Sequence, residues 1–371
     1  MSVVEDLTVT ACTIPTDAPE SDGTFAWDST TIIVVELFAG SEHGVGYTYA
    51  DSSAAHVIDG TLRDVICGRE PFDIPGAWAA MVDAIRNLGR PGIASHAIAA
   101  VDVALWDLKA KLLGLSVADL LGGQREAVPI YGSGGFTSYS NERLQEQLGG
   151  WVEQDIRLVK MKLGRHPRED RERLRAARDA IGDGAELMVD ANGAFAPKEA
   201  LEWAEIYAEY GVRWFEEPVS SDDLTGLRLL RDRGPAGMAI AAGEYGYDLA
   251  YFKRMLDAEA VDVLQADATR CAGISEFLRV GALCQAHGVK LSAHTAPSIH
   301  AHACVAINPM QHLEYFHDHV RIERMLFDGV IEPKDGMLRP DRARPGLGLG
   351  VNETELLKHA VWSSRQGQVR S

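Results

Sequence analysis

Single ionisable residues recur at nearly even intervals through the middle of this 371-residue chain, and each ends a short apolar run. From Lys162 onward, 20 to 28 residues separate one such residue from the next. That spacing accommodates a strand, a helix and two loops, so it predicts a repeated strand–helix unit. A barrel of parallel strands would gather the strand ends into one ring. The members of the predicted ring are Lys160, Lys162, Asp190, Glu216, Glu244, Asp267, His294 and Glu314.

Three carboxylates, Asp190, Glu216 and Glu244, end three consecutive predicted strands. Convergent carboxylates repel one another strongly unless a cation lies among them. Oxygen-only ligation with open positions suits Mg²⁺, which keeps water or substrate oxygens in its shell. The alternative is three unrelated surface or salt-bridged acids, which explains three strand ends in phase less well. We therefore predict one Mg²⁺ held by these three residues.

Two lysines lie two residues apart in Val-Lys160-Met-Lys162, one repeat before Asp190. On a strand, residues i and i+2 share a face, so both ammonium groups would point into the same space. Each disfavours the charge of the other, and a lysine that loses its charge near neutral pH can act as a base. A lone pair of lysines is more often a solvated strand edge, but the position one repeat before Asp190 favours a role in the ring.

Asp267 and His294 end the next two predicted strands after Glu244. Adjacent strand ends allow a carboxylate–imidazole hydrogen bond, which orients the ring and favours its protonated form. His294 is then a candidate acid or base on the side of the metal site opposite Lys162, although a single buried histidine is often structural. Glu314, on the last strand, is a candidate neutral carboxyl that donates to a developing enolate oxygen, which requires a raised pKa.

Together these groups describe one reaction class, removal of the proton next to a carboxylate. A metal ion and Glu314 would stabilise the resulting enediolate. Lys162 and His294 would stand on opposite faces of the substrate as base and acid. That arrangement supports either inversion at the α-carbon or loss of a β-hydroxyl group as water.

The N-terminal stretch carries a different pattern. Residues 7–14 and 31–38 alternate and are rich in β-branched residues, which predicts an antiparallel segment. We expect loops over residues 16–30 and 40–53, which mix aromatic and polar residues without forming a large apolar lid. Loops of that length in a compact domain are often functional lids.

Helical periodicity follows over residues 54–121. Apolar residues at i, i+3 and i+4 across residues 97–111 predict one long helix, in which we expect Asp102 and Asp107 to be structural. The segment closes on Leu-Leu-Gly-Gly123, a helix stop.

The strand–helix period ends after Glu314, and proline and glycine become frequent. We therefore predict three parts. Residues 1–124 form an N-terminal domain, residues 125–320 form the barrel, and residues 321–371 return to the first domain.

The composition excludes several classes of protein. A formal charge of −18, from 36 basic and 54 acidic residues, argues against nucleic-acid binding and against docking on an anionic membrane. Five cysteines form no CxxC pair, which is typical of free thiols in a reducing compartment. The N-terminus lacks a signal-peptide pattern, and no apolar run approaches the roughly 18 residues of a membrane span. We expect a cytoplasmic protein.

The ring residues and their flanks resemble the enolase superfamily, and specifically its mandelate racemase subgroup. The resemblance covers essentially the whole chain. The stretches that carry it are Val101-Asp-Val-Ala-Leu-Trp-Asp-Leu-Lys-Ala-Lys111, Leu120-Leu-Gly-Gly123, Val159-Lys-Met-Lys-Leu-Gly164, Val189-Asp-Ala-Asn-Gly193, Phe215-Glu-Glu-Pro218, Ala242-Gly-Glu244, Asp267, His294 and Glu314.

This resemblance implies an α/β fold, a modified TIM barrel, (β/α)₇β, under an N-terminal α+β capping domain. It implies one Mg²⁺ per subunit on the three carboxylates, Lys162 as one base and the Asp267–His294 dyad as the other. It further implies Lys160 and Asn192 as substrate contacts, and a homo-oligomer, either a dimer or an octamer.

Within that family, the resemblance favours a sugar-acid dehydratase, a lyase acting on an aldonate or aldarate. A racemase or epimerase of a 2-hydroxy acid, working by 1,1-proton transfer with the same residues, is the alternative. A lysine replaces Asp267 in the muconate lactonizing relatives, which argues against a cycloisomerase or a dipeptide epimerase. A barrel kept only for binding or assembly is a third hypothesis, which the complete set of catalytic residues disfavours.

Overall fold

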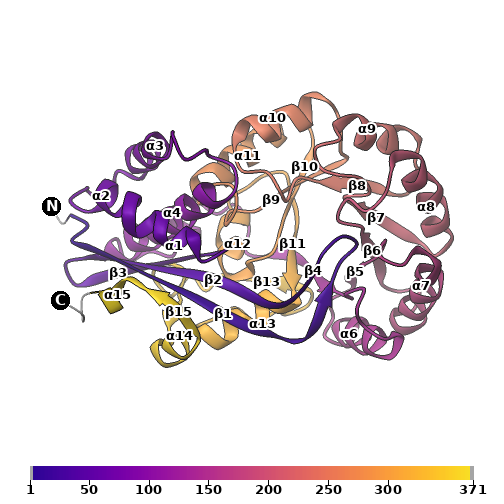
Figure 1. Ribbon diagram of the computed structural model, residues 1–371, viewed down its shortest axis with the longest axis horizontal. Coiled ribbons are helices and arrows are strands. Elements are labelled where there is room, and N and C mark those ends of the chain that lie inside the picture. The colour runs from indigo at the N-terminus through magenta and orange to yellow at the C-terminus, as the bar shows by residue number, and fades with distance from the viewer. Residues whose placement is uncertain (1–2, 368–371) are drawn as a thin grey trace.

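Eight parallel strands, β4 to β11, form a closed barrel in the computed structural model, which describes residues 3–367 (Figure 1). Each strand pairs in parallel with the next, and β11 closes the ring on β4 through Leu313 and Ile130. A short strand, β13 (Met337–Leu338), adds antiparallel to β4. The barrel strands are β4 (Val128–Gly134), β5 (Leu158–Lys162), β6 (Glu186–Asp190), β7 (Val212–Glu216), β8 (Ala239–Ala242), β9 (Val263–Ala266), β10 (Lys290–Ala293) and β11 (Met310–Phe316).

A helix follows each of the first seven barrel strands and packs against the outside of the barrel. The predicted (β/α)₇β barrel is therefore confirmed. Over residues 3–367, no helix is both long and apolar enough to cross a membrane. The outer helices are α6 (Asn141–Glu153), α7 (Pro167–Ile181), α8 (Pro197–Glu209), α9 (Leu224–Arg233), α10 (Leu249–Asp257), α11 (Ile274–His287) and α12 (Pro297–Cys304).

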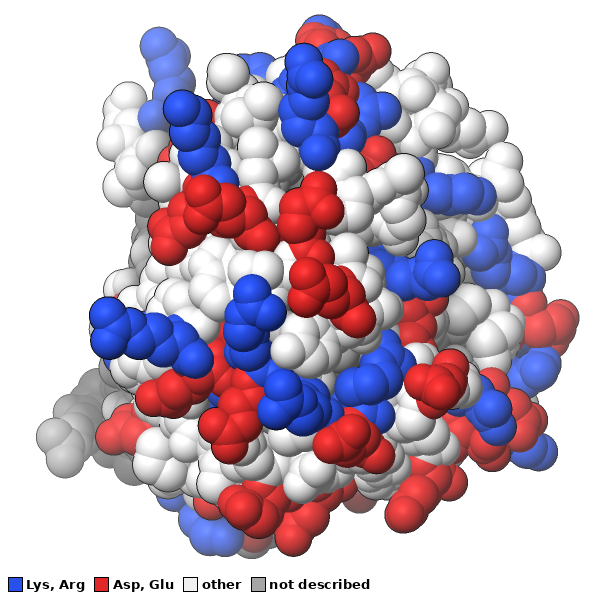
Figure 2. Space-filling model, turned by 90° about the vertical axis from the view of Figure 1, so that its right-hand side faces the viewer, with Lys and Arg blue, Asp and Glu red and all other residues white. Residues whose placement is uncertain are grey.

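The helix α7 shows how the sequence divides the inside from the outside. Leu174, Ala177 and Ile181 recur at helical spacing and are buried against the barrel, as an amphipathic helix requires. The opposite face is charged. Figure 2 shows acidic and basic side chains intermingled over this side of the molecule, so the net negative charge does not produce a uniform acidic surface on this face.

Alternation along the barrel strands decides which side chains enter the barrel. On β6, Met188 joins Tyr131 and Trp214 in a small apolar cluster inside the barrel, whereas Val189 belongs to the large cluster shared with the outer helices. Asp190 lies two residues after Met188 and therefore shares its inward face. The rule that fills the barrel with apolar side chains thus also points the last residue of the strand into the barrel mouth.

A four-stranded antiparallel sheet with helices on it forms the predicted capping domain. Its strands, in the order β15-β1-β2-β3, are β1 (Asp6–Ser21), β2 (Ala26–Ala39), β3 (Glu42–Tyr49) and β15 (Ala360–Ser363). Its helices are α1 (Ser53–Val57), a π-helical turn (Ile58–Leu62), α2 (Arg63–Ile66), α3 (Ile74–Ala84), α4 (Ile93–Leu112) and α5 (Val117–Leu120).

The remaining elements follow β11. They are α13 (His317–Leu326), the pair β12 (Phe327–Asp328) and β14 (Gly350–Val351), α14 (Glu353–His359) and α15 (Ser364–Gly367). The strand β15 lies between the last two helices and pairs with β1, so the end of the chain contributes to the N-terminal sheet. The borders expected at residues 124 and 320 stay a prediction.

The prediction of a loop over residues 16–30 is wrong. The strands β1 and β2 continue through it as a long hairpin arm, with Glu20 opposite Trp27, Ser21 opposite Ala26, and a turn only at residues 22–25. Polar residues favour a loop in a sequence read alone, but here the two strands stay paired on either side of an irregularity between Pro15 and Glu20.

The loop expected over residues 40–53 is also wrong, because β3 occupies most of it. Two glycines of β3 allow α4 to pack closely against the strand. A Cβ on Gly44 or Gly46 would lie 2.2 Å from a carbonyl oxygen of α4, that of Ala104 or Ala100 respectively. Only glycine lets this helix approach the strand so closely.

The hairpin arm crosses from the capping sheet to the barrel mouth (Figure 1). At its tip, Ser21 O accepts a hydrogen bond from Thr137 N at 2.8 Å, and Thr24 Oγ1 donates to Asn192 O at 3.3 Å. Further back, Asp17 Oδ2 lies 3.1 Å from His317 Nε2 at the start of α13. The arm is therefore anchored at both sides of the mouth and covers it.

Two buried aspartates of α4 join the capping domain to the rest of the chain. Asp102 accepts hydrogen bonds from Ser275 N at 3.0 Å and Ser275 Oγ at 2.6 Å, at the start of α11. Asp107 accepts from Val45 N at 2.7 Å and Leu347 N at 2.6 Å, and it pairs with Lys111 at 2.7 Å.

We expect Asp107→Ala to lower the free energy of unfolding by about 3 kcal/mol or more, because it leaves two buried N–H groups and one ammonium group without their acceptor. Urea unfolding measures the change. Asp59→Ala is the matched control. Asp59 pairs with Arg63 in a partly exposed site, and loss of such a pair costs about 1 kcal/mol or less. Equal losses in the two variants would contradict the structural role of Asp107.

Candidate active site

The three predicted metal ligands meet at the C-terminal ends of β6, β7 and β8. Asp190 and Glu216 are the last residues of their strands and stand opposite each other in register. Glu244 follows β8 after Gly243, whose φ of 130° and close approach to Gln265 O suit only glycine. One oxygen atom from each carboxylate lies within 4.8 Å of the other two, and all three side chains are buried.

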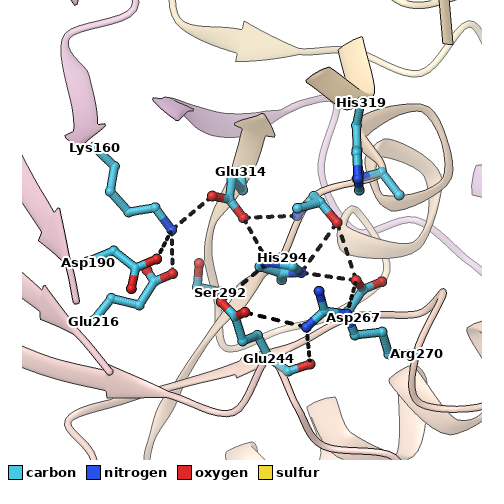
Figure 3. A network of polar contacts seen from close by, with 12 residues as sticks. Lys160, Asp190, Glu216, Glu244, Asp267, Arg270, Ser292, His294, Glu314 and His319 are labelled. Carbon is cyan, nitrogen blue, oxygen red and sulfur yellow. Dashed lines mark hydrogen bonds and ion pairs between the residues drawn. The ribbon is translucent and has the colours of Figure 1, made fainter. Parts of the chain in front are cut away.

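The two lysines of β5 reach the same carboxylates. Lys162 Nζ lies 2.5 Å from Asp190 Oδ2. Lys160 Nζ lies 2.8 Å from Glu314 Oε1 and also pairs with Glu216 (Figure 3). Burial alone would lower the pKa of each lysine, but the carboxylates outweigh burial, and the pKa of both lysines is raised above its usual value. This is opposite to the expected direction, because each lysine faces more negative charge than positive charge.

The carboxylates of the ring respond in different directions to burial. Burial raises the pKa of Glu216 well above its usual range, although Lys160 opposes it. Burial acts in the same sense on Asp190, but Lys162 and Lys160 together hold the pKa of Asp190 below its usual range. Trp214 Nε1 donates to Glu216 Oε2 at 2.8 Å and fixes that carboxylate from inside the barrel.

The predicted carboxylate–imidazole dyad is formed. His294 Nδ1 lies 3.0 Å from Asp267 Oδ2. Asp267 also accepts from Thr269 N and Thr269 Oγ1 at 2.7 Å each. Burial raises the pKa of Asp267, but the hydrogen bond and charge of His294 outweigh it and lower that pKa below its usual range. The charged Asp267 orients the ring, so His294 Nε2 faces Glu244 Oε2 at 3.3 Å and Glu314 Oε2 at 3.5 Å.

Glu314 differs from its expected state. Burial favours the neutral carboxyl, but Lys160, His294 and Lys162 together lower the pKa of Glu314 below its usual range. The main cause is Lys160, which reaches Glu314 across the barrel mouth. The backbone N–H of Thr295 also donates to Glu314 Oε2 at 3.2 Å. Glu314 therefore lies where the sequence places it, but as an ion-paired carboxylate.

The donor set fits a hard divalent cation. Asp190, Glu216 and Glu244 offer only oxygen atoms, which suits Mg²⁺. Asn192 Oδ1, a buried oxygen beside them, accepts no hydrogen bond from any residue that the structure describes. Glu244 Oε2 likewise accepts none, although His294 Nε2 lies 3.3 Å from it. Buried polar atoms are normally satisfied, so these two oxygens point to a ligand at this position.

A cavity of about 530 Å³ lies over these residues. We call its lining residues between 162 and 319 the floor. The roof is formed by its lining residues between 22 and 51, which come from the hairpin arm and from the end of β3 with the two residues after it. Lys162, Asn192, His294 and Glu314 belong to the floor. Lys160 does not line the cavity. It is fully buried, so its predicted contact with substrate has no support in this arrangement.

The structure adds one histidine to the site that the sequence did not single out. His319 lines the cavity, and its ring stacks on Tyr49 with centroids 3.4 Å apart. In the sequence, His319 could have been identified as a site residue only from its position five residues after Glu314. Arg270 also lines the cavity and lies 3.4 Å from Glu244 Oε1. Tyr245 also belongs to the floor.

A second hollow of about 580 Å³ lies at the other end of the barrel strands. Arg178, Glu186, Glu209 and Arg213 contribute to its lining. It holds none of the predicted ring residues. Barrel enzymes carry out their chemistry at the C-terminal ends of the strands, so the first cavity is the candidate active site.

Two family models match the chain. Residues 8–122 match the mandelate racemase / muconate lactonizing enzyme N-terminal domain, and residues 143–355 match the enolase C-terminal domain-like model. The chain belongs to this family. The resemblance stated from the ring residues is thereby confirmed.

Curated members of the family cover most of the chain. The L-talarate/galactarate dehydratase of Salmonella typhimurium is 33% identical over 315 residues, which is 84% of this chain and 77% of that protein. The D-galactarolactone cycloisomerase of Agrobacterium fabrum is 31% identical over 309 residues, which is 78% of this chain and 81% of that protein.

Solved structures of the family superpose closely. A mandelate racemase/muconate lactonizing enzyme-like protein from Rubrobacter xylanophilus is 56% identical, with a TM-score of 0.95 over 97% of this chain and 100% of that chain. A racemase from Streptomyces coelicolor with bound magnesium is 29% identical, with a TM-score of 0.90 over 97% of this chain and 100% of that chain.

We expect Mg²⁺ to raise the melting temperature of this protein, because a ligand that binds only the folded state stabilises it, by about 2.7 kcal/mol at a concentration of 100 Kd. Glu244→Gln keeps the size of the side chain but removes the charge of one ligand. The Mg²⁺-dependent shift should therefore shrink or vanish in that variant. Thermal unfolding with and without Mg²⁺, together with calorimetric titration, measures the difference.

Glu259→Gln is the matched control for this prediction. Glu259 is an exposed acid that pairs with Arg228 on the outside of the barrel. Its replacement should leave the Mg²⁺ shift as in the wild type. A Glu244→Gln protein that still binds Mg²⁺ with wild-type affinity would exclude Glu244 as a ligand.

Proposed function

We propose that this protein is a Mg²⁺-dependent dehydratase of sugar acids, a lyase that acts on an aldonate or an aldarate. One observation carries the proposal. Lys162 and His294 line the same cavity as Glu244 and Glu314, so a base, an acid, a metal ligand and a further carboxylate face the same space. Such a constellation suits removal of a proton next to a carboxylate.

The cation would be held by Asp190, Glu216 and Glu244. Bound there, Mg²⁺ supplies positive charge that stabilises the developing carboxylate dianion and offsets the carboxylates that raise the pKa of Lys162. The remaining chemistry belongs to this chain. Lys162 accepts the proton from the α-carbon, and the C–H bond electrons move toward the substrate carboxylate to form an enediolate.

His294 completes the reaction. Its Nε2 donates a proton to the β-hydroxyl group, the C–O bond breaks, and water leaves. The enol that results tautomerises to a 2-keto-3-deoxy acid. Asp267 keeps Nδ1 of the ring protonated and Nε2 turned toward the cavity, and it stabilises the charged imidazole.

The comparisons support this proposal over its alternatives. The relative at 33% identity is named a sugar-acid dehydratase. A racemase or epimerase is the second candidate, because the racemase structure from Streptomyces coelicolor shares the fold and binds magnesium, and Lys162 and His294 could exchange protons on opposite faces of one carbon. The name of the cycloisomerase relative indicates a lactone, although the Asp267–His294 dyad argues against that chemistry here. Lactones are included in the substrate screen to test this third possibility.

We further propose a small carboxylate as the substrate, a homo-oligomer (dimer or octamer) as the assembly, and the cytoplasm as the compartment. The acidic composition and the free thiols support the last of these. Neither nucleic acid nor a membrane is expected to bind, given the net charge of −18.

Incubation of the Mg²⁺-loaded protein with a library of sugar acids should yield a 2-keto-3-deoxy product that semicarbazide detects. Lys162→Ala and His294→Ala should each lower kcat by about 10²-fold or more, the usual contribution of a positioned acid or base. Solvent deuterium that enters the α-carbon without loss of water would select the racemase instead.

Matched controls separate chemistry from folding. Lys290→Ala and His287→Ala remove the same types of side chain from the far end of the barrel, where Lys290 and His287 are exposed. Both variants should keep wild-type activity. Full activity in Lys162→Ala and His294→Ala on a confirmed substrate would overturn the assigned roles.

A further inference from the structure

The roof of the cavity offers carboxylates, hydroxyl groups and aromatic rings. Its charged side chains are Asp22 and Asp51, its rings belong to Phe25, Trp27 and Tyr49, and residues 29–31 supply hydroxyl groups. Within residues 3–367, no lysine, arginine or histidine contributes to the roof. Arg165, which donates to Phe25 O at 3.1 Å, holds the arm but does not line the cavity.

Both roof carboxylates are fixed by their own backbone. Asp22 Oδ1 accepts from Thr24 N at 2.7 Å and from Phe25 N at 2.6 Å, which forms the turn of the hairpin arm. Asp51 Oδ1 accepts from Ser53 N at 2.8 Å. Hydrogen bonds from Ser53 lower the pKa of Asp51. The roof therefore presents fixed negative charge to whatever occupies the cavity.

The cationic side chains lie on the floor, next to the reacting groups. Lys162 contacts Asp190, and Arg270 lies 3.4 Å from Glu244 Oε1 and 3.7 Å from Asp267 Oδ2. His294 is held by Asp267. A substrate carboxylate thus meets positive charge only at the floor, where the proton is removed.

The aromatic rings of the roof are held in place before any ligand binds. Trp27 Nε1 donates to Glu20 Oε2 at 2.8 Å, and the indole packs edge-to-face on Phe136 with centroids 5.5 Å apart. Tyr49 stacks on His319. Such rings give C–H groups of a carbon chain a rigid apolar surface, while the neighbouring carboxylates accept hydrogen bonds from its hydroxyl groups.

We propose that the substrate is an aldonate, with its single carboxylate at the floor and an uncharged polyol chain against the roof. This inference rests on the proposed function. A second carboxylate, as in an aldarate, would lie against Asp22 and Asp51 with no cation to pair with, and like charges brought together at a binding surface cost affinity. In this respect the chain differs from what the name of its talarate/galactarate dehydratase relative indicates for that protein.

The test compares each aldonate with the aldarate of the same configuration, such as galactonate with galactarate and gluconate with glucarate. The Mg²⁺-loaded wild type should prefer the aldonate of its best pair in kcat/KM by about tenfold or more, as expected for one unpaired charge. Calorimetric binding of the same pairs gives a second measurement that does not depend on turnover.

Asp51→Asn should lower the ratio of kcat/KM for the aldonate to kcat/KM for the aldarate by about threefold or more. The change removes a roof charge and keeps the oxygen that accepts from Ser53 N. Asp28→Asn is the control. Asp28 lies on the same arm, is exposed and does not line the cavity, so its replacement should leave the preference unchanged.

The outcomes separate the two proposals. Preference for an aldarate, in turnover or in binding, overturns the aldonate assignment and leaves the dehydratase standing. An equal fall of the aldonate-to-aldarate ratio in Asp28→Asn and Asp51→Asn also overturns the aldonate assignment. Aldonate binding without turnover of any acid contradicts the dehydratase and supports the assignment of the roof.

Discussion

The structure depends on a concentration of charge that the protein alone does not balance. Three cationic side chains meet five buried carboxylates at the barrel mouth. Lys160 and Lys162 are buried and Arg270 is partly exposed, and the carboxylates are those of Asp190, Glu216, Glu244, Asp267 and Glu314. Burial of each unpaired ion costs several kcal/mol. The carboxylates outnumber the cationic side chains, and a divalent cation bound among them would offset this excess. Burial raises the pKa of Glu217 beside them well above the usual value, as it does for Glu216.

Much of this site could be predicted because it follows from local rules. Alternation along a strand points Asp190 and Glu216 into the barrel, and strand–helix repeats of similar length bring their strand ends together. The contacts across the barrel could not be predicted this way. The strand β5 carries Lys160 and β11 carries Glu314, with β4 between them. Only the closed ring brings the two side chains within 2.8 Å, and that contact sets the ionisation of Glu314.

The strands of the roof could not be predicted for another reason. Residues 16–30 are polar and contain proline and glycine, which favours a loop, yet they form the arm because it rests on the barrel and on α13. Gly44 and Gly46 also suggested a loop, but they are glycines because α4 packs too closely on β3 to leave room for a side chain. In both places a tertiary contact overrides the local preference. The sequence therefore predicted the ring residues and marked both roof segments as lids, but it missed the strands that these segments form.

The strand β15 has a consequence for how the molecule is made. Residues 360–363 complete the sheet from which the hairpin arm extends, by pairing with Thr10 to Cys12 of β1. About 350 residues separate these partners along the chain, and contacts so distant in sequence form late and slowly. Because a chain emerges from the ribosome N-terminus first, the barrel and its buried charges can assemble before the sheet receives its last strand. The sheet that carries the hairpin arm is then completed last, and a chain cut short by a dozen residues lacks its edge strand β15.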